Sequence, residues 1–235
     1  MRPVARMGYH VPVLFIQELQ HDPRFYFAVI IAVVVSICLH ELAHGIVAVK
    51  LGDDTPIEQG RMTLNPLVHM GPISLVVLLI SGIAWGLMPI DRTRLRGKYG
   101  EAQVAAAGPF CNVLIALLTL TALGLWQRYR ELPTEELSTM ANNGEFLLWV
   151  FGRMNVALAL FNLVPCPPLD GSHILANFSK SFARTLDLMI RTGTYFRFAI
   201  ILFAVGGYVI FPFADKLALG YLLWVRGEPQ AFWEL

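Results

Sequence analysis

Two histidines and a glutamate stand close together in the segment HELAHG, residues 40–45. In a helix, side chains four positions apart lie on the same face, so His40 and His44 can share one metal ion. Imidazole nitrogens are common zinc ligands, and a glutamate beside them can take a proton from water that the ion activates. The spacing therefore predicts a hydrolytic Zn²⁺ site with Glu41 as the catalytic base.

The residues in front of this segment make a metal site the favoured interpretation. The run FAVIIAVVVSICL, residues 27–39, contains no ionisable side chain. Ionisable groups inside a membrane helix are costly and usually serve a function. The alternative is that His40 and His44 only reach from a helix end to the membrane interface. Because each of them needs a partner inside an apolar helix, we favour metal binding.

A catalytic zinc ion usually has three protein ligands, and HELAHG supplies two. The pattern HExxHxxGxxH, which would bring a third histidine, is not matched. Glu58 is the one nearby glutamate on the C-terminal side, but it falls in a polar loop. Asp170 lies in NLVPCPPLDG, residues 162–171, at the end of an apolar stretch, and is the strongest remaining candidate. An ordinary interfacial turn at PPLDG is the alternative.

The composition indicates which elements must position these residues. Of 235 residues, 56% are hydrophobic and 15% are charged, whereas soluble domains carry roughly 25% charged residues. Several apolar stretches reach the roughly 20 residues that cross a bilayer. We therefore expect an all-α polytopic membrane protein with about five to six membrane segments. These stretches are residues 25–49, 73–90, 102–126, 146–169 and 198–214.

The charge pattern favours a lipid bilayer as the partner and excludes nucleic acid. The net charge is +1, and basic residues gather beside apolar runs, as in RTRLRGK at residues 92–98. This placement is typical of membrane-flanking loops rather than of a phosphate-binding surface.

Three parts follow along the chain. Residues 1–24 are expected to form an N-terminal interfacial segment, and residues 25–175 the catalytic membrane core. Residues 176–235 are expected to form a C-terminal membrane helix and an interfacial tail. Between the first two apolar runs, residues 52–71 are polar and include RMTL, residues 61–64, for which a short β-hairpin-like element is predicted.

The stretch 73–90 decides the topology. If it crossed the membrane fully, His44 and Asp170 would face opposite sides, whereas a re-entrant segment puts them on the same side. Glycine and proline within these 18 residues favour re-entry, provided that protein covers the backbone. The loops on the side of the site would then hold ten Lys and Arg residues against five on the other side. This bias predicts a site nearer the cytoplasm, and a midplane site with a full crossing is the alternative.

Taken together, HELAHG and NLVPCPPLDG resemble the site-2 protease family of intramembrane zinc metalloproteases, whose pattern is HExxH followed by NxxPxPxLDG. The segment AGPFCN, residues 107–112, is similar to the GPxxN element of that family. GRMTLNPLVHMGP, residues 60–72, is similar to a stretch of its compact bacterial members, which lack an appended soluble domain. One departure is Gly71, which stands where the family usually has an aspartate.

The resemblance implies that His40, His44 and Asp170 bind one Zn²⁺ per chain and that Glu41 activates water. It also implies an integral protein of the bacterial inner membrane that carries out regulated intramembrane proteolysis. The implied reaction is hydrolysis of a peptide bond in or near a transmembrane segment of a membrane-protein substrate.

Three further polar residues are candidates for binding the substrate. Asn112 and Asn162 are hydrogen-bonding groups in apolar helices, and we expect at least one of them to bind the substrate backbone or the oxyanion. Hydrogen bonding between helices is the alternative for both. His69, in the turn NPLVHMGP, could approach the site, or it could be an ordinary surface histidine.

The alternative function is a non-proteolytic membrane zinc-binding protein, such as an inactive homologue, a scaffold or a carrier. A carrier would be expected to show more ionisable residues in its spans and an internal repeat. Neither is evident, and Glu41 is present, which weakens the case for an inactive homologue. The sequence names no substrate and does not decide whether the chain forms a homo-oligomer.

Overall fold

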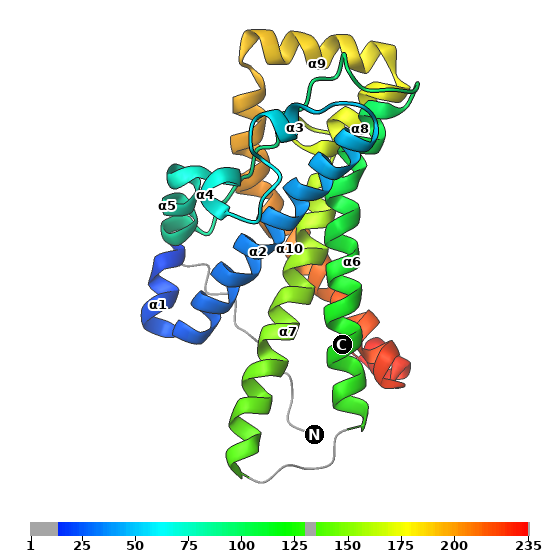
Figure 1. The fold of residues 1–235 in the computed structure, drawn as a ribbon. Helices are drawn as coiled ribbons and strands as arrows, with labels where there is room; N and C mark the ends of the chain where they lie inside the picture. Colours follow the sequence, from blue (N-terminus) through cyan, green and yellow to red (C-terminus); the bar gives the residue numbers. More distant parts are fainter. Residues whose placement is uncertain (1–13, 130–134, 235) are drawn as a thin grey trace.

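The structure is a computed structural model that describes residues 14–129 and 135–234 (Figure 1). Every regular element in these residues is helical, so the predicted all-α class is confirmed for them. The elements are η1 (Phe15–Gln17), α1 (Glu18–His21), α2 (Pro23–Lys50), α3 (Thr55–Glu58), α4 (Pro66–His69), α5 (Gly71–Ser81), α6 (Gly100–Tyr129), α7 (Glu135–Asn162), α8 (Asp170–Phe178), α9 (Lys180–Thr192), α10 (Tyr195–Arg226) and η2 (Pro229–Glu234).

Four helices in the described residues are long and apolar enough to cross a membrane: α2, α6, the stretch Asn142–Asn162 of α7 and the stretch Gly206–Arg226 of α10. The predicted count of five to six membrane segments is not confirmed. At 1.5 Å per residue, the 11 residues of α5 are too short to span a bilayer. The expected last span and the expected interfacial tail belong to one continuous helix, α10.

The long helices extend further than their apolar cores. The sequence indicates a polar connector over residues 127–145, but α6 continues to Tyr129 and α7 begins at Glu135. Residues such as Glu, Leu and Met in EELSTM are good helix formers, so polarity alone does not end a helix there. Residues 130–134 of this connector, and residues 1–13 of the predicted N-terminal segment, lie outside the described residues.

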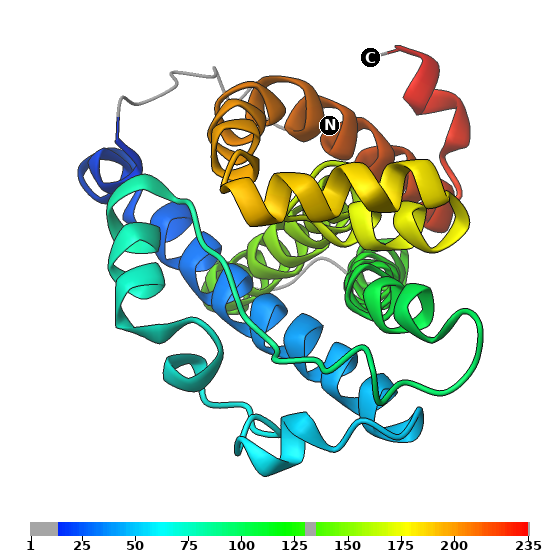
Figure 2. The same cartoon turned by 90° about the horizontal axis from the view of Figure 1, so that it is seen from above.

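Between α2 and α6 the chain leaves the bundle and returns to the place from which it left. Figure 2, seen from the end that carries α9, shows the extended chain after α5 running along α2 before it enters α6. The backbone N–H of Asp91 donates to Asp53 Oδ2 at 2.8 Å, and that of Arg96 donates to Leu51 O at 2.9 Å. Both bonds tie the returning chain to the C-terminal end of α2. We call residues 52–99 the excursion.

The β-hairpin-like element predicted in the excursion is not confirmed, because the described residues include no strand. Local hydrogen bonds occupy the groups that a strand would need. Asn65 caps α4 by accepting the N–H of Leu67 at 3.0 Å, and Thr63 O lies 2.6 Å from His69 Nε2. Such side-chain bonds to nearby backbone compete with sheet pairing.

The core that carries the site is formed by α2, α6 and α7, which pack against one another. Small buried residues, such as Ala32 and Ala116, let these helices approach closely. Helix α8 packs against α6, α10 packs against α6 and α7, and α9 lies across the end of the bundle (Figure 1). Within the bundle, Arg153 of α7 and Asp215 of α10 form an ion pair at 2.9 Å.

Candidate metal centre

The structure brings together three side chains that could hold one metal ion, His40, His44 and Asp170. Both histidines are buried on α2, and their Nε2 atoms lie 3.0 Å apart. Asp170 is the first residue of α8, which begins after the proline-rich turn. Its Oδ2 lies 3.1 Å from His40 Nε2, and its Oδ1 lies 3.4 Å from His44 Nε2. The groups therefore come from two elements, α2 and α8, and His40 and Asp170 are 130 positions apart in sequence.

The other ring nitrogen of each histidine is occupied by an acceptor. His44 Nδ1 lies 2.7 Å from the carbonyl oxygen of Val104, and His40 Nδ1 lies 2.6 Å from Asn112 Oδ1. A carbonyl oxygen only accepts hydrogen bonds, so each Nδ1 carries the proton and each Nε2 keeps a lone pair. Partners of this kind fix the tautomer and the ring orientation of metal-binding histidines.

The arrangement has the electrostatics of a cation site. The two Nε2 lone pairs and the Asp170 carboxylate face one another at 3.0–3.4 Å, with no proton between them in these tautomers. Asp170 Oδ2 is buried and has no hydrogen-bond partner among the described residues. A cation between these groups would replace repulsion by attraction. Two histidines and one carboxylate are also a ligand set of catalytic zinc, so the residues fit that ion.

Gly108 of α6 leaves the space in which these groups meet. A Cβ atom built at this position would overlap the Nε2 atoms of both His40 and His44. The helix backbone therefore approaches the imidazoles as closely as a residue without a side chain allows. The GPxxN element thus has two local consequences: Gly108 gives room to the rings, and Asn112 hydrogen-bonds His40.

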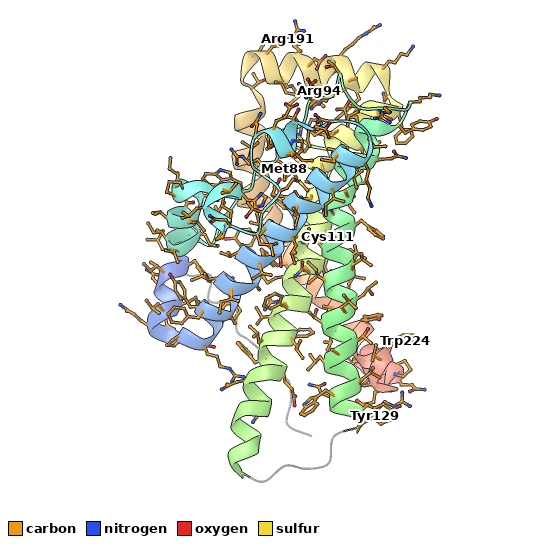
Figure 3. All side chains as sticks on the ribbon, viewed as in Figure 1. Met88, Arg94, Cys111, Tyr129, Arg191 and Trp224 are labelled. Atoms are coloured by element: carbon orange, nitrogen blue, oxygen red, sulfur yellow. The ribbon has the colours of Figure 1, made fainter. Side chains whose placement is uncertain are left out.

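The opposite side of the site contains Glu41, which is buried on α2. A Cβ at Gly86 would overlap the Glu41 carboxylate, so the extended segment 83–90 of the excursion lies directly against this side chain. A Cβ at Gly45 would meet Met62 and Met88, which both belong to the excursion. Figure 3 shows Met88 where the excursion faces α2. Glu41 thus lies against the excursion, whereas the two candidate histidine ligands lie against helix α6.

The segment 83–90 is tied to the rest of the excursion by a few hydrogen bonds. Ser74 Oγ accepts the N–H of Trp85 at 2.9 Å and donates to the carbonyl oxygen of Trp85 at 2.8 Å. The N–H of Leu87 donates to His69 O at 3.0 Å. These bonds fix the path of the backbone past Glu41.

The remaining candidates lie outside the metal group. His69 is buried, and its Nδ1 has no hydrogen-bond partner among the described residues. Asn162 donates from Nδ2 to Leu158 O of its own helix at 3.0 Å. Asn112 has both ends of its amide engaged, so it contacts His40 rather than open space. Glu58 pairs with Arg94 at 2.8 Å on the surface, away from the ligands.

Sequence reasoning missed two buried polar residues near the site, Ser36 and Asn155. Asn112 Nδ2 donates to Asn155 Oδ1 at 2.8 Å, and Asn155 Nδ2 donates to Ser36 Oγ at 2.8 Å. Both are uncharged polar residues inside apolar helices, which is the same sequence feature that made Asn112 a candidate.

Comparison with known proteins identifies the class to which this site belongs. The "Putative zinc metalloprotease YwhC" of Bacillus subtilis (strain 168) is 33% identical over 186 residues, covering 78% of this chain and 84% of that protein. The "Putative zinc metalloprotease Rip2" of Mycolicibacterium smegmatis is 31% identical over 160 residues, covering 63% and 58%. "Zinc metalloprotease MJ0392" of Methanocaldococcus jannaschii is 27% identical over 190 residues, covering 80% and 45%. These relatives are zinc metalloproteases by name.

The family follows from a match over most of the chain. The family model of Peptidase family M50 matches residues 28–205, which include both sequence motifs and all three candidate ligands. The chain belongs to Peptidase family M50, the site-2 protease family, and the resemblance seen in the sequence is confirmed. Its cofactor is Zn²⁺. No solved structure matches the chain.

Proposed function

We propose that the protein is an intramembrane zinc endoprotease that hydrolyses a peptide bond in or near a transmembrane segment of a membrane-protein substrate. The observation that carries the proposal is the convergence of His40, His44 and Asp170 beside Glu41 in a bundle of membrane-length helices. A zinc site for a soluble substrate would not need to lie among such helices.

The roles of the residues follow from their chemistry. His40, His44 and Asp170 would hold the ion. When bound, Zn²⁺ supplies a Lewis acid that polarises the scissile carbonyl and makes water nucleophilic near neutral pH. Glu41 takes a proton from the attacking water and passes it to the amine as the C–N bond breaks. The substrate segment must unwind first, because a helix keeps its carbonyl groups in internal hydrogen bonds.

Two of the predicted substrate contacts remain proposals. His69 Nε2 faces the carbonyl oxygen of Thr63, so its Nδ1 keeps a lone pair that can accept an N–H of the substrate backbone. Asn162 lies at the end of α7, just before the turn that leads to Asp170. Asn112 is not proposed as a substrate contact, because its amide is occupied.

We also propose that the protein is an integral protein of the bacterial inner membrane with its site nearer the cytoplasm. Arg94 and Arg191 lie at the end of the bundle that carries the site, whereas Tyr129 and Trp224 lie towards the other end (Figure 3). Basic residues favour the cytoplasmic side, which supports this orientation. The return of the excursion to the end of α2 supports a re-entrant stretch over residues 73–90.

Labelling of single cysteines tests the orientation. In a variant without the three native cysteines, Gln59→Cys and Thr93→Cys should react with an impermeant thiol reagent from the same side of the membrane. Asn143→Cys, which lies exposed near the start of α7, should react from the opposite side. Labelling of Gln59→Cys and Thr93→Cys from opposite sides would exclude the re-entrant arrangement.

Membrane-protein fragments in cells test the proteolytic function. Cells that produce the wild-type chain are compared with cells that produce Glu41→Gln, and new protein termini are identified by mass spectrometry. Termini in or near transmembrane segments should appear with the wild type and with Glu58→Gln, which makes the same chemical change at an exposed glutamate. If the Glu41→Gln cells contain the same termini, the protein is not the protease that produces them.

A further inference from the structure

A line of buried polar side chains leads from His40 away from the metal centre and into the helix bundle. His40 Nδ1 lies 2.6 Å from Asn112 Oδ1, Asn112 Nδ2 lies 2.8 Å from Asn155 Oδ1, and Asn155 Nδ2 lies 2.8 Å from Ser36 Oγ. Asn112, Asn155 and Ser36 are 0% exposed, and they belong to α6, α7 and α2. The line therefore connects a candidate ligand with the three helices of the core.

The direction of these hydrogen bonds is fixed at the end far from the metal centre. Asn155 Nδ2 also lies 2.9 Å from the backbone carbonyl oxygen of Phe151. This oxygen only accepts, so the amide of Asn155 must turn its NH₂ group towards Phe151 and its Oδ1 towards Asn112. Asn112 must then offer its own NH₂ group to Asn155, which turns Asn112 Oδ1 towards His40.

The orientation of Asn112 decides which nitrogen of His40 carries the proton. With Oδ1 facing the ring, Nδ1 must donate, and Nε2 keeps the lone pair that a metal ion needs. If the amide of Asn112 were reversed, its NH₂ group would face Nδ1 and favour the tautomer with the proton on Nε2. That tautomer cannot bind an ion at the position shared with His44 and Asp170.

The two histidines differ in this respect. His44 Nδ1 bonds directly to the carbonyl oxygen of Val104, which has no second orientation. His40 bonds to an amide side chain, whose two ends have nearly the same shape but opposite hydrogen-bonding character. His40 therefore needs a further contact that prevents the reversal, and Asn155 is the residue in contact with the other end of that amide.

We propose that Asn155 is a positioning residue that holds His40 in its metal-binding tautomer by fixing the orientation of Asn112. The inference rests on the proposed role of His40 as a metal ligand. Asn155 touches neither the ligand atoms nor the substrate, and its effect passes through Asn112. Ser36 accepts a hydrogen bond from the same NH₂ group of Asn155, but Phe151 O alone suffices to set the orientation of the Asn155 amide.

Metal binding by purified protein in detergent micelles tests the proposal without any substrate. The affinity for Co²⁺ and Zn²⁺ is measured by competition with a chelator, and the Co²⁺ absorption spectrum reports the geometry of the ligands. Asn155→Leu should weaken metal binding by about 10-fold, at the low end of the range for loss of an outer partner of a ligand, and should alter the Co²⁺ spectrum. Ser36→Ala should have a smaller effect on both.

Two variants separate orientation of the amide from mere packing. Asn155→Asp keeps an oxygen towards Asn112 and, as the neutral acid, an O–H towards Phe151, so its affinity and spectrum should stay near those of the wild type. Asn143→Leu repeats the leucine substitution at an exposed asparagine of the same helix and should change nothing. If Asn155→Leu does not yield folded protein, Asn155→Ser, whose hydroxyl is too short to reach Asn112, has the same expected result.

The outcomes distinguish this inference from the proposed function. If the wild type binds no metal, or if His40→Ala binds it equally well, the metal centre itself is wrong. If the wild type binds metal through His40 and Asn155→Leu binds it with the same affinity and spectrum, only the role of Asn155 is overturned. Equal losses in Asn155→Leu and Asn155→Asp would also overturn that role, because they would indicate packing.

Discussion

The two sides of the candidate site are built in different ways. On the ligand side, α6 contacts His40 and His44 through two buried hydrogen bonds and close packing at Gly108, and α8 brings Asp170 to them. On the other side, Glu41 lies against the extended segment 83–90, which is held by few hydrogen bonds. Segments of this second kind open more easily than packed helices.

The exposed side chains sharpen this difference. In segment 83–90, Trp85 is 45% exposed and Leu87 is 60% exposed, and in α5 Ile73 is 71% exposed. In a membrane these apolar side chains can contact lipid or an apolar substrate, so their exposure costs little there. The comparison teaches that the candidate ligands lie among packed helices, whereas Glu41 lies against a loosely held segment. The proposed substrate would approach Glu41 from the side of the excursion, where segment 83–90 lies against its carboxylate.

The largest expected effect is loss of the metal when a ligand is removed. Asp170→Ala should reduce bound zinc from one ion per chain to almost none, because two imidazoles alone leave the ion without its anionic ligand. Zinc per chain is measured by mass spectrometry of the purified protein. His173→Ala changes a histidine on the same helix and should keep the ion. Full zinc content in Asp170→Ala would show that Asp170 is not a ligand.

Gly108→Ala tests the close packing on the ligand side. The added Cβ would lie only 2.4 Å from each of the two Nε2 atoms, and overpacking of this kind costs about 1–3 kcal/mol. We expect zinc affinity to fall about 10-fold or more, measured by chelator competition. Gly144→Ala is the matched control, because a Cβ at Gly144 meets nothing within 4 Å. Unchanged affinity in Gly108→Ala would contradict the described approach of α6 to the ligands.

Gly86→Ala tests the other side of the site. The new Cβ would displace the Glu41 carboxylate, and a displacement of about 1 Å can cost about 100-fold in rate. We therefore expect a much lower cleavage rate with unchanged zinc content. If zinc is lost together with activity, the two sides are not independent and the comparison fails.

Ser74→Ala should give the smallest effect. It removes the hydrogen-bond partner of the N–H and the carbonyl group of Trp85, so segment 83–90 is attached less firmly to α5. Hydrogen–deuterium exchange should become faster in residues 83–87 and stay unchanged in residues 104–116, with full zinc content. Ser181→Ala on α9 is the control. Equal protection of residues 83–87 in both variants would mean that other contacts hold the segment.

Local spacing made part of this account predictable from the sequence. His40 and His44 share a face because α2 is a regular helix through HELAHG, as its apolar run predicts. Asp170 could be proposed because few acids lie near the ends of the apolar stretches. Its distance from the histidines could not be predicted from these features, because it depends on how α8 packs against α6.

Contacts between helices account for what the sequence did not reveal. Asn155 and Ser36 lie in apolar helices, and nothing local indicates that they meet Asn112. The contact between Gly86 and Glu41 depends on the return of the excursion, which is fixed by bonds such as that between Asp53 and Asp91. Residues 127–145 were expected to form a polar connector, but residues 127–129 belong to α6 and residues 135–145 belong to α7, because helix propensity does not require apolarity.

The central claim is that Glu41 is the base of a zinc-dependent peptide hydrolysis. The most direct measurement determines zinc content and cleavage of a membrane-protein substrate on the same proteoliposome preparations of wild type and Glu41→Gln. We predict one zinc ion per chain in both and a cleavage rate about 100- to 10,000-fold lower in Glu41→Gln, the usual contribution of a general base. Cleavage by Glu41→Gln at the wild-type rate would contradict the account.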